Sequence, residues 1–178
     1  MSAIFLDENS APSLRQVLGA SLARAAEADF AVARIRLAAI DLAPDEVAGV
    51  RRWRVLLGRL DVESFARPGD GRDAHADART LLRLFDNGRI AVRAAGIQTW
   101  YPDFAVLRGL TGGGSATLLG AIYFGTPQHT DGPALTCILT DAAPAASATA
   151  RFDHLWRRGY DVAPVVRAAL ERLAGPRG

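Results

Sequence analysis

The chain has 178 residues, of which 49% are hydrophobic and 22% charged, a composition typical of a folded globular protein with a sizeable core. All 21 basic residues are arginine, and the absence of lysine excludes a Walker A phosphate loop, a Schiff-base enzyme and any lysine-dependent phosphodiesterase site. A net charge of +2 is too small to indicate nucleic-acid binding by itself.

Strand-like and helix-like segments alternate along the first half of the chain. Pro12 and Ser13 suit the start of a helix, and an apolar stripe at helical spacing extends it until Asp29, which is expected to break it. The predicted elements are an arm at 1–9, helices at 13–28, 44–50, 73–85, 143–158 and 162–173, strands at 30–37, 53–60, 89–94, 100–108, 116–124 and 133–140, and a tail at 175–178.

The order of these elements predicts the fold class. Residues 53–60 have a continuous apolar middle, which is typical of a buried parallel strand. The loop 109–115 is rich in glycine and most simply joins 100–108 and 116–124 as an antiparallel pair. We therefore expect a layered α/β sandwich that spans the chain as a single domain.

Most of the chain, roughly from Leu14 to Val166, resembles a known family in the order and pattern of its elements. Two buried strands joined by a glycine-rich loop, a third apolar run, and a helix with Phe152-Asp153-His154-Leu155-Trp156 follow each other as in one lobe of the phospholipase D-like superfamily. The resemblance implies an α/β/α sandwich, with a mixed sheet flanked by helices. It also implies two lobes that face each other, and so a homodimer or a heteromeric protein partner.

The catalytic signature of that family is His-x-Lys, in which the histidine attacks phosphorus and the lysine holds the phosphate oxygens. The corresponding strand, 100–108, contains neither residue. On the next strand Gly120-Ala121-Ile122-Tyr123 stands where the family offers serine and asparagine. The resemblance therefore implies a catalytically inactive domain that acts as a binding or assembly subunit, without a cofactor or metal.

Three arginines form a candidate anion site. Arg34 and Arg36 share one face of the predicted strand 30–37, and Arg59 lies at the end of the neighbouring strand. Ligands of open α/β sheets bind beyond the carboxyl ends of parallel strands, so the three guanidinium groups could bind a phosphate there. The alternative is ordinary ion pairing with Asp41 and Asp61. Phosphate binding would favour a nucleic-acid-binding accessory factor in DNA processing or defence.

A second candidate site lies between the last two predicted strands. His129 and Asp131 could form a general base for a phosphodiesterase or hydrolase with a non-standard site, although a loop histidine beside an aspartate is common. No second histidine or cysteine stands at metal-ligand spacing. The side chains expected to line the cleft are Tyr101, Asp103, Tyr123, His129 and Asp131.

The sequence also predicts where the protein acts. The N-terminal residues lack the basic start and apolar core of a signal peptide, and no apolar run approaches the ~18–20 residues of a membrane span. With a single cysteine, Cys137, no disulfide can form within the chain. We expect a cytoplasmic protein without a membrane partner.

Overall fold

The structure is a computed structural model that describes residues 3–6, 11–33, 44–58, 60, 74–96, 103–120 and 136–175. The strands are β1 (Ala3–Leu6), β2 (Glu27–Val32), β3 (Arg52–Leu57), β4 (Ile90–Ala94), β5 (Phe104–Arg108), β6 (Ser115–Gly120), β7 (Thr136–Leu139) and β8 (Tyr160–Asp161). The helices are α1 (Leu14–Leu22), α2 (Pro44–Ala48), α4 (Ala74–Asp86), α5 (Ala142–Arg158) and α6 (Ala163–Ala174).

The eight strands form one mixed sheet in the order β1-β7-β6-β5-β2-β3-β4-β8. β2, β3 and β4 are parallel, and every other neighbouring pair is antiparallel. We call the edge of the sheet at which β2, β3 and β4 begin the amino edge, and the edge at which they end the carboxyl edge. By these pairings β5, β7 and β8 begin at the carboxyl edge.

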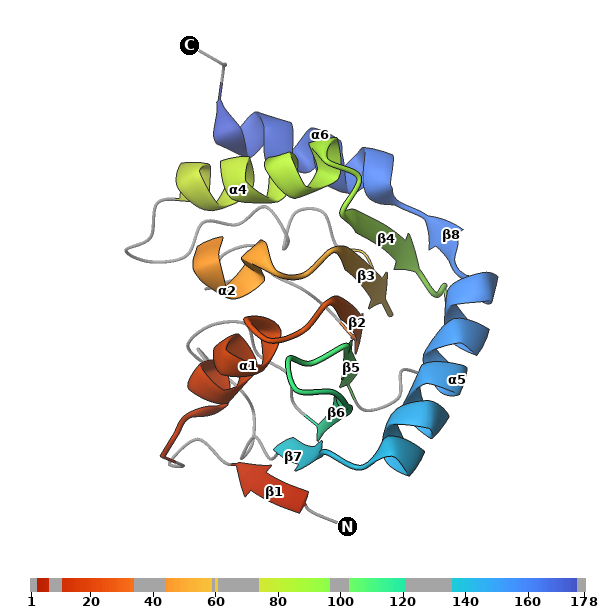
Figure 1. The fold of residues 1–178 in the computed structure, drawn as a ribbon. Coiled ribbons are helices and arrows are strands. Elements are labelled where there is room, and N and C mark those ends of the chain that lie inside the picture. The colour runs from red at the N-terminus through yellow and green to blue at the C-terminus, as the bar shows by residue number, and fades with distance from the viewer. Residues whose placement is uncertain are drawn as a thin grey trace.

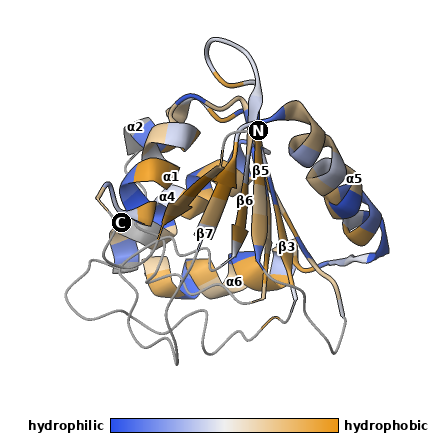
Figure 2. Cartoon of the chain, turned by 90° about the horizontal axis from the view of Figure 1, so that it is seen from below, coloured by the Kyte–Doolittle hydropathy of each residue, from blue (hydrophilic) through white to orange (hydrophobic). Residues whose placement is uncertain are grey.

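Helices cover both faces of the sheet, which confirms the predicted α/β/α sandwich with a mixed sheet (Figure 1). Among the described helices, α1, α2, α4 and α6 lie on one face and α5 lies on the other (Figure 2). The larger core, under the four helices, includes Leu18, Phe30 and Leu107. The smaller core, under α5, consists of Ala31, Leu56, Phe104, Val106, Phe152 and Leu155. Alternation along the strands produces both cores, because successive side chains point to opposite faces.

The first predicted helix begins where expected but ends early. Ser13 caps α1 by accepting a hydrogen bond from the Gln16 backbone N–H, and the Gln16 side chain accepts one from the Ser13 N–H. The extension of this helix to residue 28 is wrong, because the helix ends at Leu22 and β2 begins at Glu27. Asp29 does not break a helix. It lies inside the strand, fully buried, and is held by long-range ion pairs that helical periodicity does not reveal.

The predicted hairpin is confirmed. β5 and β6 pair antiparallel, with Arg108 opposite Ser115 at the turn. Of the strands predicted at 100–108 and 116–124, the structure describes residues 103–108 and 116–120. Asp103 precedes β5, which begins at Phe104, and β6 ends at Gly120. The rest of each prediction lies outside the described residues. The two-residue strand β8, beside β4, was not predicted, because it is too short to carry a periodic pattern.

The hairpin loop supplies a stability test. Gly109 has φ +63°, and a Cβ there would lie 2.9 Å from the Ala26 Cβ at the start of β2. Gly112, in the same loop, has φ +93° and open space around its Cβ position. Both alanine variants should lose about 1–2 kcal/mol from the positive φ, and Gly109→Ala should lose more because Ala26 must also move. Urea denaturation measures both, and equal free energies of unfolding would contradict the contact with Ala26.

Candidate functional site

The carboxyl edge is where the sequence predicts the site. Asp103, immediately before β5, is half-buried there, and its Oδ1 accepts a hydrogen bond of 2.7 Å from the Ala33 backbone N–H. Its carbonyl oxygen accepts another, 2.9 Å long, from the Gly120 N–H. Asp103 therefore connects the end of β2, the start of β5 and the end of β6.

Asp103 is the one predicted site residue within the described part of the chain. The other seven lie outside it: Arg34, Arg36, Arg59, Tyr101, Tyr123, His129 and Asp131. In the sequence, Arg34 and Arg36 follow β2 and Arg59 follows β3. Their roles stay predictions.

The strand that resembles the catalytic strand of the phospholipase D-like family is apolar and enclosed. Along β5, Phe104 is 7% exposed, and Ala105, Val106 and Leu107 are completely buried. Ala105 and Leu107 pack in the larger core, while Phe104 and Val106 pack in the smaller one. From Phe104 to Leu107, both faces of this strand are therefore filled by core packing.

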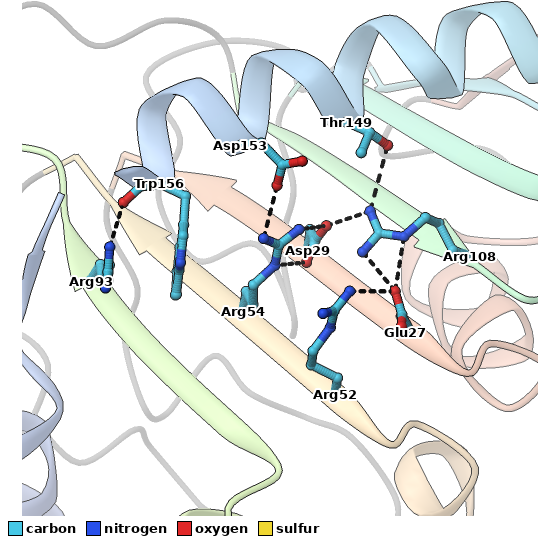
Figure 3. A network of polar contacts seen from close by, with 9 residues as sticks. All are labelled: Glu27, Asp29, Arg52, Arg54, Arg93, Arg108, Thr149, Asp153 and Trp156. Carbon is cyan, nitrogen blue, oxygen red and sulfur yellow. Dashed lines mark hydrogen bonds and ion pairs between the residues drawn. The ribbon is translucent and has the colours of Figure 1, made fainter. Parts of the chain in front are cut away.

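Sequence reasoning missed a cluster of charges under α5 (Figure 3). At its centre is the fully buried side chain of Asp29 on β2. Arg54 on β3 donates to both Asp29 oxygens, from Nε to Oδ1 and from Nη2 to Oδ2, each at 2.7 Å. Arg108 on β5 donates from Nη1 to Asp29 Oδ2 at 2.5 Å. One carboxylate thus links three neighbouring strands by charge-assisted hydrogen bonds.

Glu27 extends the cluster to the amino edge. Its Oε2 accepts hydrogen bonds from Arg52 Nη2 at 2.7 Å and from Arg108 Nη2 at 2.9 Å. The strand register places Glu27 opposite Arg52 and Asp29 opposite Arg54, so two acids on β2 face two arginines on β3. The paired pattern Glu-x-Asp and Arg-x-Arg on adjacent strands is the signal that could have revealed the cluster from the sequence.

Two arginines of the sheet, Arg54 and Arg93, hold α5 against it. Arg54 Nη1 donates to Asp153 Oδ1 at 2.8 Å, and its guanidinium lies over the Phe152 ring, 4.7 Å from the ring centroid. Arg93 on β4 donates to the Trp156 carbonyl at 2.8 Å, and its guanidinium lies 5.0 Å from the centroid of that side chain. The aromatic side chains of α5 therefore contact the sheet through cation–π interactions as well as through apolar contacts.

Hydrogen bonds within the cluster shift the pKa values of Arg54, Arg108 and Glu27. The hydrogen bonds to Asp29 raise the pKa of Arg54. Burial lowers the pKa of Arg108, but its bonds to Asp29 and Glu27 raise it overall. Burial also acts to raise the pKa of Glu27, but the hydrogen bonds from Arg108 and Arg52 lower it overall. Because guanidinium groups occupy these carboxylates, the cluster supplies structural charge pairs and no free general base.

The described residues show no metal centre and no membrane span. Among them, no three histidine, cysteine, aspartate or glutamate side chains are grouped to hold a metal ion. No helix in the described part of the chain is long and apolar enough to cross a membrane.

Comparison with solved structures identifies the fold. NucT from Helicobacter pylori superposes with a TM-score of 0.57 at 11% identity, covering 90% of this chain and 98% of NucT. The phospholipase D family member Nuc from Salmonella typhimurium gives 0.54 at 14% identity, covering 90% and 97%. The chain has a phospholipase D-like fold. This likeness covers nearly the whole length of both neighbours, and at these identities it shows the fold alone.

A third neighbour is a DNA-binding protein. TrmBL2, an archaeal chromatin protein with a novel mode of DNA binding, has a TM-score of 0.52 at 12% identity. The match covers 91% of this chain and 54% of TrmBL2, so the chain corresponds to about half of that protein. No protein-family model matches the chain, and no curated protein matches its sequence.

Replacing Asp29 by asparagine tests the buried cluster. The change removes the charge that Arg54 and Arg108 share, and breaking a buried pair costs roughly 3–5 kcal/mol. The matched control is Asp86→Asn, which weakens an ion pair to Arg167 whose side chains are 39% and 40% exposed, and should cost under about 1 kcal/mol. Urea denaturation measures both variants. Equal losses of free energy would show that the buried charge of Asp29 is no more important to stability than a surface charge.

Glu27 provides a pH test. Its folded-state pKa lies below the ordinary value of 4.5, so its contribution to stability is present above that pH and is lost as the pH falls through the folded pKa. The free energy of unfolding of the native chain should therefore fall more between pH 7 and pH 3 than that of Glu27→Gln. Denaturation series at the two pH values measure this difference, and parallel losses would contradict the lowered pKa.

Proposed function

We propose that the chain is a non-catalytic phospholipase D-like domain that acts as a binding or assembly subunit. The observation that carries this proposal is the core packing on both faces of β5 from Phe104 to Leu107, which lies within the strand 100–108 to which the resemblance assigns catalysis. The chain also contains no lysine anywhere, so the family's phosphate-holding group has no counterpart in it.

The polar contacts of Asp103 support the same proposal. Its carboxylate accepts a hydrogen bond from the Ala33 backbone, and its carbonyl accepts one from Gly120. This aspartate therefore helps to fix three strand ends at the carboxyl edge. The resemblance also implies an assembly of two lobes, which a protein partner or a second copy of the chain would complete. Sedimentation equilibrium measures the oligomeric state of the purified chain.

Nucleic-acid binding is the second candidate function. It is favoured by the fold shared with TrmBL2, a DNA-binding chromatin protein, and by the arginine content of the chain. In this form the domain would be an accessory factor in DNA processing or defence, with Arg34, Arg36 and Arg59 as the predicted phosphate ligands.

A hydrolysis assay tests the main proposal. We expect the purified chain to release no p-nitrophenol from bis(p-nitrophenyl) phosphate above the buffer rate, with or without chelator. A phospholipase D-family enzyme that carries His-x-Lys serves as the positive control. Turnover by the pure chain would refute the proposal. Loss of that turnover in His129→Ala would then assign it to a non-standard hydrolase site at His129 and Asp131.

A further inference from the structure

Six arginines gather at the amino edge, on the far side of the sheet from the predicted site. They belong to the segments 24–27, 51–52, 83–89 and 108–111. Backbone hydrogen bonds bring these segments together. Ala26 N–H donates to the Arg108 carbonyl at 2.9 Å, Arg51 N–H donates to the Ala26 carbonyl at 2.8 Å, and Trp53 N–H donates to the Arg89 carbonyl at 2.7 Å. The arginines of this basic edge are Arg24, Arg51, Arg52, Arg83, Arg89 and Arg108.

The outer arginines of the basic edge are accessible. Arg24, Arg51 and Arg83 are exposed, and the Arg52 side chain is 53% exposed even though it pairs with Glu27. The side chains of Arg51 and Arg83 make no hydrogen bond or ion pair with another residue of the described chain. Within that part of the protein, two guanidinium groups are thus free to bind a ligand.

The inner arginines support the outer ones. Arg89 donates from Nη2 to the Ala48 carbonyl at 2.7 Å and also to the Val50 carbonyl. Arg108 is held by Asp29 and Glu27, as described above (Figure 3). These hydrogen bonds hold the guanidinium groups of Arg89 and Arg108 in place beside the exposed arginines.

Little negative charge opposes the basic edge. Its four segments contain two acids, Glu27 and Asp86, and a third acid, Asp29, binds Arg108 from within β2. Arginines already bind all three of them. Because the whole chain has 21 basic and 19 acidic residues, acids outnumber arginines outside these segments. The small net charge of the chain is therefore compatible with a locally basic surface, and such a surface attracts a polyanion.

We propose that the basic edge binds the phosphate backbone of double-stranded nucleic acid. Neighbouring strands are ~4.8 Å apart, so the starts of β2, β3 and β4 and the end of β5 span about 14 Å. Along a duplex axis each strand carries one phosphate per ~3.4 Å, so this span faces about four phosphates of one strand. Guanidinium groups suit such contacts, since each can bind phosphate oxygens through two parallel hydrogen bonds.

The composition of the basic edge favours a duplex over a single strand. Single-stranded nucleic acid is typically bound by exposed aromatic side chains on which bases stack. The aromatic residue in these segments, Phe85, is half-buried and packs against the larger core. Phosphate contacts without base stacking predict binding that is independent of sequence and steeply dependent on salt.

A purely structural role makes a different prediction. α1, α2 and α4 end at the amino edge, and arginines near helix C-termini stabilise the helix dipole. Arg89 has such a role through the carbonyl of Ala48. If Arg51 and Arg83 had only that role, their replacement would change stability and leave duplex binding intact.

Fluorescence anisotropy with a labelled 24-base-pair DNA duplex tests the basic edge across a salt series. The key variant is Arg51→Gln/Arg83→Gln. Its matched control is Arg157→Gln/Arg158→Gln, which removes the same charge from two exposed arginines in the last turn of α5. The rival variant is Arg34→Gln/Arg36→Gln, at the site predicted from the sequence.

We expect the native chain to bind the duplex more tightly than the matching single strand. The Arg51/Arg83 variant should bind more weakly, with a salt slope shallower by about 1 for each phosphate that the variant no longer binds. The control should bind like the native chain, and thermal melting should show that all variants are folded.

Three outcomes would overturn the proposal: no duplex binding at 50 mM salt, equal weakening by the key variant and its control, or weakening by the Arg34/Arg36 variant alone.

Duplex binding supplies a partner for the binding role proposed above, but it does not depend on the loss of catalysis. Failure to bind a duplex would leave the hydrolysis result unchanged. Cleavage of the bound duplex would refute the proposed function and leave the basic edge standing.

Discussion

The fold depends on one buried carboxylate that three strands share. Asp29 is completely buried in the centre of the sheet, where an unpaired charge would be prohibitively unfavourable. Arg54 and Arg108 make it tolerable by hydrogen bonding to both of its oxygens from the strands on either side. The same guanidinium of Arg54 reaches Asp153 on α5, so the pairing of β5, β2 and β3 and the position of that helix are coupled.

This constraint gives the two edges of the sheet different character. At the amino edge, the arginines that satisfy Asp29 and Glu27 stand beside Arg51 and Arg83, which have no ion pair within the described chain. At the carboxyl edge, Asp103 fixes the ends of β2 and β6 through backbone groups. Between the two edges, core packing fills both faces of β5 from Phe104 to Leu107.

Local patterns predicted the layers of the fold but not the charges that organise it. The β5–β6 hairpin follows from a glycine-rich loop between apolar runs, and both strands were expected. The early end of α1 was missed because an aspartate is unfavourable in a buried strand unless it is paired. The partners of Asp29 are Arg54 and Arg108, 25 and 79 positions away, and the local sequence does not show these pairings. Of the site residues predicted from the resemblance, Asp103 lies in the described chain. The basic edge could not be predicted because its arginines are spread over four segments that only the sheet pairing brings together.

If this domain binds nucleic acid without hydrolysing it, one incubation shows both properties. An end-labelled DNA duplex is equilibrated with the purified chain at low salt with magnesium, and the same sample is run on a native gel and on a denaturing gel. We expect a retarded duplex on the first gel and full-length strands on the second. Shortened strands would contradict the proposed loss of catalysis, and an unretarded duplex would contradict the basic edge as a nucleic-acid surface.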